Sequence, residues 1–334
     1  MSVGRHTLGD WLCWAERQYA RHRLALGQVA ATAHDEALYL LLHTLDLPLE
    51  SPATVLRRKL TAGETARVKE VFQRRIKDHV PAAYLTHEAF LGEHRFHVDE
   101  RVIIPRSYFV ELLPQIAELL GCRAGSPTPP SGARQSRRST VASTRRRNAR
   151  RGGVSDPALQ LNPVKRAADV CTGSGCLAIL LARQFPAAKV DAIELSPDAL
   201  AVAKFNVAQH RLTGRVKCIR SDVFDAVPRV KYDLILSNPP YVPTRELRGL
   251  PAEFRREPAM ALDGGRDGLD IIRKLLLQAR DRLRPRGLVV LEVGGLRAAM
   301  DRAFPELDLH WLPTGDGEDC VCFIQAHRLC SWKV

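Results

Sequence analysis

Apolar side chains in the first eighty residues recur at the spacing of α-helices. Over residues 8–24 and 34–45 they return every three or four positions. Thr61-Ala-Gly-Glu64 has the form of a capping box, in which a threonine and a glutamate satisfy the first N–H groups of a helix. The apolar face of that helix consists of Val68, Val71, Phe72 and Ile76. These patterns predict a small helical domain over residues 1–80, with Pro81 ending its last helix.

The pattern changes to a two-residue alternation from Arg95 onward. Phe96 and Val98 alternate with polar residues, and a turn at Asp99-Glu100 separates them from the apolar run 102–104. This arrangement predicts a β-hairpin. Residues 107–120 return to helical spacing and predict a short helix. We therefore expect residues 81–123 to link the helical domain to the rest of the chain.

Residues 124–162 contain almost no large apolar side chains. Burial there cannot offset the entropy lost on ordering, so we predict a disordered, arginine-rich insertion. Between Arg123 and Arg166, eleven basic residues against one acid account for +10 of the net charge of +13. Two interpretations are open: an arm that contacts RNA, or a solvated loop of low complexity. The lack of aromatic residues among the arginines, which would stack on bases, favours the loop.

Strand-like and helix-like segments alternate over residues 163–334. The predicted helices include 176–185 and 197–210, and the predicted strands are 167–171, 189–194, 216–221, 232–237, 287–293, 307–312 and 320–326. Regular β-α alternation predicts an α/β fold with a doubly wound, mostly parallel sheet. The last two strands are joined only by a Gly/Asp-rich link, which predicts an antiparallel hairpin at the edge.

The overall composition is that of a globular protein. Hydrophobic residues make up 45% of the 334 residues and charged residues 26%. No apolar run approaches the ~18 residues that a membrane span needs, and the first residues lack the apolar core of a signal peptide. The eight cysteines form no CxxC pair, which argues against a disulfide framework or a zinc ribbon. We therefore expect a cytoplasmic protein without membrane contact.

Candidate ligand-binding residues follow the first three strands of this alternation, where open parallel sheets bind their ligands. After the first strand, Asp169-Val-Cys-Thr-Gly-Ser-Gly175 leads directly into a helix, whose glycines and free N–H groups suit a close ligand. Glu194, nineteen residues after Gly175, suits two ribose hydroxyls, and Asp222 suits an adenine amine. Each also has a simpler interpretation. The glycines can serve tight packing, Glu194 can be a charge at a helix N-terminus, and Asp222 can be a turn residue.

The strongest chemical signal, Asn238-Pro239-Pro240-Tyr241, ends the fourth strand. Because proline has no N–H, this segment presents carbonyl acceptors. The Asn238 amide oxygen and the Pro239 carbonyl can each accept one N–H of a planar NH2 group, and Tyr241 supplies an aromatic wall. Such a clamp aligns the nitrogen lone pair for attack. The alternative is an ordinary turn after a strand.

With these motifs the chain resembles the HemK family of S-adenosylmethionine-dependent protein-glutamine N5-methyltransferases. Within that family it is most similar to the PrmB branch, which modifies a glutamine in a large-subunit ribosomal protein. The resemblance covers nearly everything outside 124–162, and its motifs occupy residues 83–86, 98–107, 169–176, 193–206, 237–242, 250–258, 264–270 and 291–294. The Pro105-Arg106-Ser107 turn and Leu250-Pro-Ala-Glu-Phe-Arg-Arg-Glu-Pro258 favour PrmB over the branch that modifies peptide release factors.

The resemblance implies a class I methyltransferase fold, Rossmann-like and seven-stranded, over residues 163–334, and a substrate-recognition role for residues 1–80. It implies S-adenosylmethionine as methyl donor, which needs no metal. No acids cluster at ligand spacing around His87, His94 and His97, so we expect surface histidines there instead of a metal site. The implied substrate-binding residues are Asn238, Pro239, Pro240 and Tyr241, supported by Arg106. The implied cofactor-binding residues are Asp169, Cys171, Thr172, Gly173, Ser174, Gly175, Glu194, Asp222, Val223 and Asn238.

This sequence departs from the family pattern in two places. Cys171 stands where most methyltransferases have glycine, and residues 315–320 match the edge hairpin of the PrmB branch only loosely.

Four other functions stay open at this point. The first is methylation of a release-factor glutamine, and the second is methylation of an exocyclic amine on a nucleic-acid base, which presents the same NH2 group. The third is a nicotinamide oxidoreductase, which leaves Asn238 to Tyr241 unexplained. The fourth is a ribosome-assembly factor that keeps the fold without catalysis.

Overall fold

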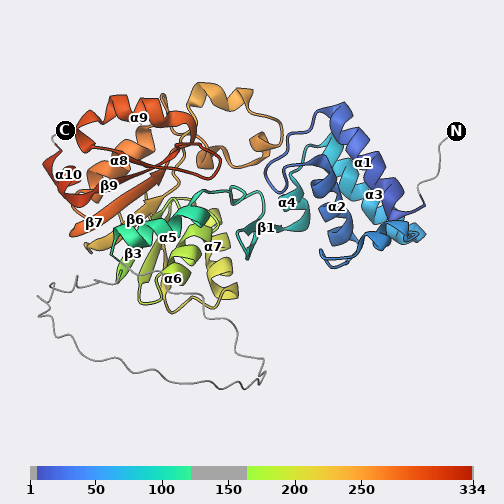
Figure 1. The fold of residues 1–334 in the computed structure, drawn as a ribbon, viewed down its shortest axis with the longest axis horizontal. Coiled ribbons are helices and arrows are strands. Elements are labelled where there is room, and N and C mark those ends of the chain that lie inside the picture. Colours follow the sequence, from blue (N-terminus) through green and yellow to red (C-terminus); the bar gives the residue numbers. More distant parts are fainter. Residues whose placement is uncertain (1–5, 122–163, 333–334) are drawn as a thin grey trace, which may run out of the picture.

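The computed structural model describes residues 6–121 and 164–332, and its N-terminal part is a bundle of helices (Figure 1). The helices are α1 (Leu8–His22), α2 (Ala33–Thr44), α3 (Ala62–Lys77) and α4 (Ala82–Thr86), with a 3-10 turn, η1 (Ala53–Arg57), before α3. The predicted capping box of Thr61 and Glu64 is present at the start of α3. Trp11 and Phe72 stack in the centre of the bundle, with ring centroids 6.4 Å apart. Pro81 does not end α3, which stops at Lys77, but precedes α4, because proline suits the start of a helix.

A two-stranded hairpin follows the bundle, one strand earlier than predicted. It consists of β1 (Glu88–Leu91) and β2 (His94–His97), paired antiparallel around a turn at Gly92, whose φ of 59° suits glycine. The predicted hairpin around Asp99-Glu100 is therefore wrong. The alternation in 96–104 has another cause: Val98, Val102 and Ile104 are buried in one apolar cluster without a partner strand.

Seven strands form the main sheet, in the order β5-β4-β3-β6-β7-β9-β8. They are β3 (Arg166–Val170), β4 (Lys189–Glu194), β5 (Val216–Arg220), β6 (Tyr232–Ser237), β7 (Leu283–Glu292), β8 (His310–Leu312) and β9 (Val321–Gln325). β3 to β7 pair in parallel, and β9 pairs antiparallel with both β7 and β8. The predicted α/β class, with a mostly parallel sheet and an antiparallel edge hairpin, is confirmed.

Two strands begin more than one residue away from their predicted starts. β7 begins at Leu283, before the predicted start at residue 287. The predicted strand 307–312 is shorter, because Pro305–Leu307 forms a 3-10 turn (η6) and Asp308 is left-handed with φ 53°. Proline fixes φ near the 3-10 value, so the apolar Leu307 packs into the core from a turn instead of a strand.

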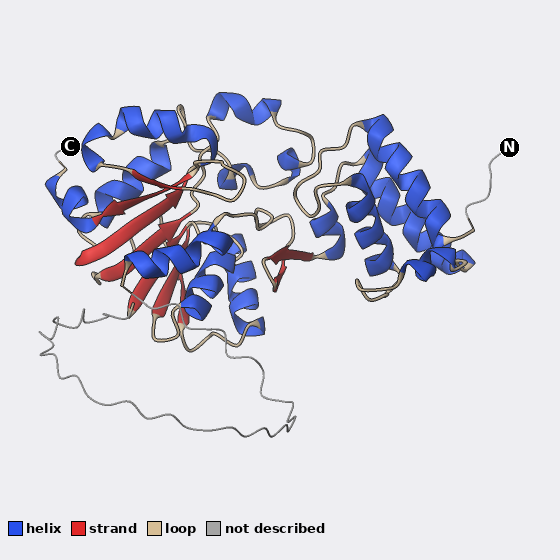
Figure 2. Ribbon diagram, in the orientation of Figure 1, coloured by secondary structure: helices blue, strands red, loops and turns tan. Residues whose placement is uncertain are grey.

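Helices cover both faces of this sheet (Figure 2). One face carries α5 (Phe109–Leu119), α6 (Cys176–Gln184) and α7 (Pro197–Gln209), and the other carries α8 (Asp270–Ala279), α9 (Arg297–Ala303) and α10 (Ala326–Ser331). Along β6, Leu234 and Leu236 enter the first core, whereas Ile235 enters the second. Strands buried on both faces explain why the sequence shows continuous apolar runs there.

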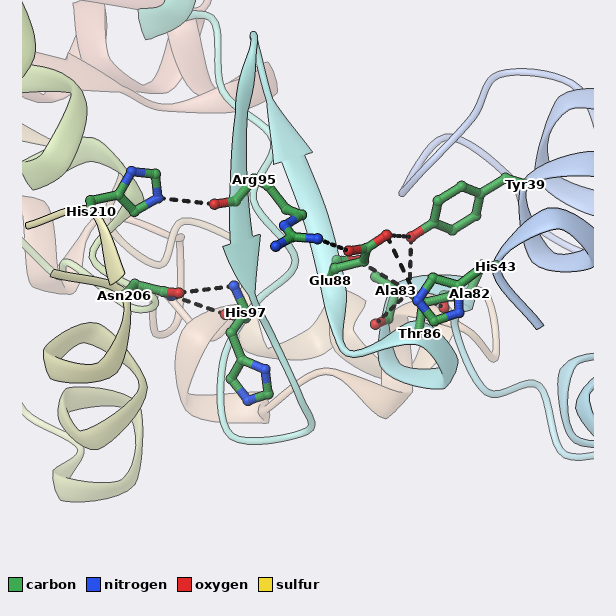
Figure 3. Close-up of polar contacts among 10 residues, drawn as sticks. All are labelled: Tyr39, His43, Ala82, Ala83, Thr86, Glu88, Arg95, His97, Asn206 and His210. Atoms are coloured by element: carbon green, nitrogen blue, oxygen red, sulfur yellow. Dashed lines mark hydrogen bonds and ion pairs between the residues drawn. The ribbon is translucent and has the colours of Figure 1, made fainter. Parts of the chain in front are cut away.

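The hairpin joins the bundle to the sheet domain through side chains at its open end, where Glu88 and His97 are paired (Figure 3). On the bundle side, Tyr39 of α2 donates a hydrogen bond to the Glu88 carboxylate at 3.0 Å. On the sheet side, the buried Asn206 of α7 accepts from the His97 N–H at 2.8 Å and donates to the His97 carbonyl at 3.0 Å. Asn206 also donates to the carbonyl of Ser174 at 2.9 Å, so one side chain holds the hairpin against the loop after β3.

Residues 243–263, which we call the strap, form a second connection between bundle and sheet. The strap contains three 3-10 turns, η2 (Thr244–Gly249), η3 (Phe254–Arg256) and η4 (Ala259–Ala261). Its Glu253 is buried beside Arg75 (3.3 Å) and His79 (2.9 Å) of the bundle. Glu253 is therefore withdrawn from solvent and serves the contact between the strap and the bundle.

The expectations about membrane spans and about the insertion can be compared only with the residues that the structure describes. Within 6–121 and 164–332, no helix is long and apolar enough to cross a membrane. The insertion predicted over 124–162 lies outside the described residues, so its disorder and its RNA contact stay predictions.

Candidate active site

The loop between β3 and α6 brings backbone N–H groups to the carboxyl edge of the sheet. Its left-handed residues are Cys171, Gly173 and Gly175, with φ of 62°, 54° and 81°. A Cβ on Gly175 would meet Ala203 Cβ at 3.1 Å, so this glycine is required by packing against α7. A Cβ on Gly173 would have one neighbour within 4 Å, Ile103 at 3.8 Å, because Gly173 borders a cavity. Tight packing therefore explains the glycine at position 175. At position 173, the open space beside the backbone fits the close approach of a ligand.

Cys171, the residue in place of the usual glycine, lies half-buried at the base of this loop. It packs against the apolar core of the second sheet face and also lines the cavity. Burial raises the pKa of its thiol far above the ordinary range, so the side chain stays a neutral thiol. A non-glycine residue at a φ of 62° carries backbone strain, as residues at ligand sites often do.

Glu194 ends β4 beside this loop and is held by two backbone donors. Its carboxylate accepts from the N–H of Gly173 at 2.9 Å and from the N–H of Ser196 at 3.0 Å. A carboxylate has about four acceptor sites, so Glu194 keeps free lone pairs toward the cavity that it lines. These are the acceptors that two vicinal hydroxyls of a ribose require.

Asp222 and Val223 follow β5 and border the same cavity. Asp222 forms an ion pair with Lys274 of α8 at 2.7 Å, and Lys274 also holds Asp225 at 2.7 Å. Val223 is left-handed with φ 51°, which is unusual for a β-branched residue. Lys274, a partner of Asp222 at the cavity, was not predicted from the sequence, because nothing near Asp222 in the chain points to a helix fifty residues further on.

Asp169 and Gly175 do not line the cavity, unlike the other predicted cofactor residues. Asp169 is fully buried beneath the loop, where the Thr172 hydroxyl donates to it. Burial raises the pKa of the Asp169 carboxyl to about 7. Both residues therefore shape the loop from below and have no direct route to a ligand in the cavity.

Asn238-Pro239-Pro240-Tyr241 forms the opposite wall of the cavity. The Asn238 amide donates to Glu292 at the end of β7, with Nδ2 and Oε1 3.0 Å apart. Two glycines pack against this segment: a Cβ on Gly264 would meet Tyr241 Cα at 2.7 Å, and one on Gly294 would meet the Tyr241 ring at 2.6 Å. The motifs at 264–270 and 291–294 therefore fit around Asn238 to Tyr241, a role that the sequence did not reveal.

Arg106 also borders the cavity, but its guanidinium is already engaged. It forms two hydrogen bonds to the Glu257 carboxylate of the strap, at 2.6 and 2.7 Å, and lies 4.9 Å over the ring of Phe254. A paired guanidinium of this kind fixes the strap against the turn at 105–107. Arg106 thus contributes to the shape of the cavity wall, and the supporting role expected of it stays a prediction.

These walls enclose one cavity of about 710 Å³, a size typical of cofactor sites. One half is formed by residues after the first three strands: Cys171, Thr172, Gly173, Ser174, Glu194, Asp222 and Val223. The other half is formed by the clamp and its surroundings: Arg106, Asn238, Pro239, Pro240, Tyr241, Leu250, Phe254 and Met260. The first half fits an adenosyl cofactor. It offers the Glu194 acceptors for a ribose, an open backbone at Gly173 and the apolar side chain of Val223.

The three histidines singled out from the sequence do not gather into a ligand set. His87 and His97 lie with ring centroids 6.0 Å apart, and His94 lies beside His210. Among the residues with described positions, no group of three His, Cys, Asp or Glu side chains is placed to hold a metal ion.

Comparisons with known proteins found a family model, similar sequences and similar structures. Residues 157–254 match the family model of the methyltransferase small domain. The ribosomal protein uL3 glutamine methyltransferase of Burkholderia pseudomallei is 41% identical over 97% of this chain and 95% of its own. The enzyme of the same name from Neisseria gonorrhoeae is 39% identical over 97% of this chain and 95% of its own. A solved structure of the human methyltransferase 10 domain containing protein aligns at 15% identity over 79% of this chain and 97% of its own, with a TM-score of 0.40.

Proposed function

This chain belongs to the family of ribosomal protein uL3 glutamine methyltransferases, and from this premise we propose how its cavity acts. The enzyme transfers a methyl group from S-adenosylmethionine to the side-chain amide nitrogen of a glutamine in ribosomal protein uL3 of the large subunit. The observation that carries the proposal is that the clamp at Asn238 to Tyr241 and the Glu194 half share one cavity. The substrate amide and the methyl donor can therefore be bound next to each other, each by its own side of the cavity.

The clamp binds the substrate amide by its two N–H groups. Asn238 Oδ1 accepts one and the Pro239 carbonyl accepts the other, which holds the amide plane fixed. Tyr241 closes one side of that plane. An amide nitrogen is a poor nucleophile, and fixed orientation toward the reacting carbon contributes much of the rate in such reactions.

The Glu194 half holds the cofactor. Glu194 would accept from the ribose hydroxyls, Asp222 and Val223 would contact the adenine, and the backbone from Cys171 to Gly173 would lie beside the methionine part. When bound, S-adenosylmethionine supplies a methyl group on a positively charged sulfur, which departs as a neutral thioether. We propose that no metal takes part, because the leaving group is already activated by its own charge.

The proton of the attacking amide nitrogen needs no dedicated base. Once the new N–C bond forms, the amide nitrogen carries a positive charge and becomes acidic. The proton then passes to water at the cavity mouth, and the amide returns to neutrality. The clamp, Asn238 to Tyr241, therefore needs only acceptors and an aromatic ring for this step.

Substrate choice must come from surfaces around the clamp, since the clamp itself addresses only an amide. We propose that the helical bundle and the strap bind the parts of the substrate protein that surround the glutamine. The strap supports this, because its Leu250, Phe254 and Met260 line the substrate half, and Met260 is 58% exposed. Contact with RNA through residues 124–162 stays a further, separate prediction.

The test is methyl transfer to purified, unmodified uL3 and, side by side, to an unmodified peptide release factor. Mass spectrometry should locate one added methyl on a uL3 glutamine, with much slower modification of the release factor. Mature ribosomes should be poor substrates if RNA covers that glutamine. Efficient modification of the release factor and none of uL3 would assign the other branch, and label in RNA would assign a nucleic-acid base.

A further inference from the structure

A buried carboxylate, Glu292, lies directly behind the clamp. Glu292 is the last residue of β7 and is 4% exposed. Its strand pairs in parallel with β6, with Leu291 opposite Ser237, so Glu292 comes beside Asn238. It is not among the residues that line the cavity.

Glu292 receives three hydrogen bonds from two segments. Its Oε1 accepts from Asn238 Nδ2 at 3.0 Å. Its Oε2 accepts from the Ser107 hydroxyl at 2.5 Å and from the Tyr108 N–H at 3.1 Å. All three partners are donors, which is the arrangement that an ionised carboxylate satisfies.

This contact decides which end of the Asn238 amide faces the substrate. An amide has an NH2 end that donates and an oxygen that accepts, and neighbouring groups determine its orientation. An ionised Glu292 accepts only, so it attracts the NH2 end and leaves Oδ1 on the side of the cavity. From this geometry we infer that Glu292 is a positioning residue, which keeps the Asn238 oxygen directed at the N–H group of the substrate glutamine.

The inference rests on the proposed function, and it predicts that the more conservative of two substitutions is the more harmful. In Glu292→Gln, the oxygen of the new amide would keep both bonds from Ser107 and Tyr108, and its NH2 would face Asn238. Asn238 would then turn its oxygen toward residue 292 and its NH2 group toward the cavity, where it repels the substrate N–H. Glu292→Ala leaves Asn238 free to rotate, so it should be less harmful than the nearly isosteric glutamine.

A protonated Glu292 should act like the glutamine. Burial raises the pKa of this carboxyl to about 7, and the Arg106 guanidinium opposes the rise. The other titratable groups that face it are Tyr241 and Cys320, and burial raises the pKa of each to about 12, so both are neutral between pH 6 and 8. A change of turnover with pH near 7 can therefore be traced to Glu292 by comparing variants.

The first experiment measures kcat on uL3 from pH 5.5 to 9, with S-adenosylmethionine and uL3 both saturating. The wild-type kcat should fall as pH drops through about 7. Glu292→Gln should be roughly 100-fold slower at pH 8 and flat with pH, as expected for a misoriented contact. Glu292→Ala should lie between the two, and Glu292→Asp should recover part of the wild-type rate.

A second readout needs no turnover and separates this inference from the proposed function. The side-chain amide NH2 signals of Asn238, assigned in 15N spectra by their loss in Asn238→Asp, should shift with a midpoint near pH 7 in the wild type and stay unchanged in Glu292→Gln. The dissociation constant of S-adenosylmethionine should stay within about threefold in all variants, which shows that they fold.

The outcomes divide clearly. A Glu292→Gln enzyme with wild-type rate and pH profile, or wild-type Asn238 signals without a pH shift, would overturn the positioning role. A wild-type enzyme that never methylates uL3, but whose Asn238 signals titrate with Glu292, would overturn the proposed function and leave the positioning role supported.

Discussion

At the level of single residues, we propose that one part of the cavity binds the cofactor and another part performs the transfer. Glu194 keeps acceptor sites free although two backbone N–H groups already bind it. Asn238 lies on the opposite wall and depends on Glu292 for its orientation. Substitutions at Glu194 and Asn238 should therefore affect different measurements.

We expect Glu194→Ala to weaken binding of S-adenosylmethionine by roughly 1–3 kcal/mol, the cost of leaving buried hydroxyls without acceptors. Asn238→Ala should do the reverse: turnover is lost while the cofactor dissociation constant stays within a few-fold. Titration calorimetry measures the binding, and Glu306→Ala, at an exposed glutamate far from the cavity, is the control. Equal loss of cofactor binding in both variants would mean that Asn238 has been assigned to the wrong half.

The raised pKa of Glu292 also predicts how stability depends on pH. The folded-state pKa of about 7 exceeds the ordinary 4.5, so the folded protein holds an extra proton between these values. The contribution of Glu292 to stability is therefore lost as pH rises from 4.5 to 7. Glu292→Gln should remove this loss, so its stability relative to the wild type should improve by roughly 1–3 kcal/mol across that window.

Urea unfolding of both proteins at pH 5 and pH 7.5 checks this prediction. The test uses the difference between the two pH values, because the substitution also changes hydrogen bonds at any pH. A variant whose stability relative to the wild type is the same at both pH values would show that Glu292 titrates normally.

At the scale of elements, one face of α8 supports the loop that follows β5. Lys274 bridges Asp222 and Asp225, and Gln278 one turn later accepts from the N–H of Phe224 at 2.7 Å. Between these contacts Val223 is held in a left-handed conformation. The helix therefore holds a strained loop in the shape that borders the cavity.

We expect Lys274→Met to weaken cofactor binding, because Asp222 and Asp225 would repel each other without the cation between them. Both carboxylates are about half exposed, so the loss should be modest, about 0.5–1 kcal/mol. Added salt should reduce the difference between variant and wild type. Lys69→Met, at an exposed lysine of α3, is the matched control. Tighter cofactor binding in Lys274→Met would mean that Lys274 competes with the adenine for Asp222.

At the scale of the whole molecule, the strap and the hairpin hold the bundle beside the cavity. Arg75, fully buried in the bundle, pairs with Glu36 at 2.7 Å and with Glu253 of the strap at 3.3 Å. Four residues further on, Glu257 pairs with Arg106 at the cavity wall. One segment thus connects the position of the bundle to the shape of the substrate half.

We expect Glu253→Gln to raise the KM for uL3 several-fold without changing cofactor affinity. Arg75 keeps Glu36, so the buried charge stays paired, and the cost to stability should be about 1–3 kcal/mol. Steady-state kinetics against uL3 and thermal unfolding measure the two effects. Glu246→Gln, at an exposed position of the same strap, is the control. A loss of cofactor binding equal to the loss of substrate affinity would place Glu253 outside substrate recognition.

The sequence alone determined the elements whose signals are local. Helices of the bundle, the central strands and the mostly parallel order follow from side-chain periodicity over ten to twenty neighbouring residues. The rim of the cavity was predictable for a related reason: carboxyl ends of parallel strands meet at one edge, so Gly173, Glu194, Asp222 and Asn238 converge without knowledge of the loops.

The tertiary structure decided what depends on residues far apart in the chain. The hairpin was misplaced because apolar alternation records burial, and burial of Val98 and Ile104 came from neighbours that are not strands. Glu292, Lys274 and Glu257 carry no local signal, since each acts on a residue 50 or more positions away. Their roles follow from packing, which brings distant segments together; at the buried Glu257 and Glu292 it also supplies the partners that a buried carboxyl group requires.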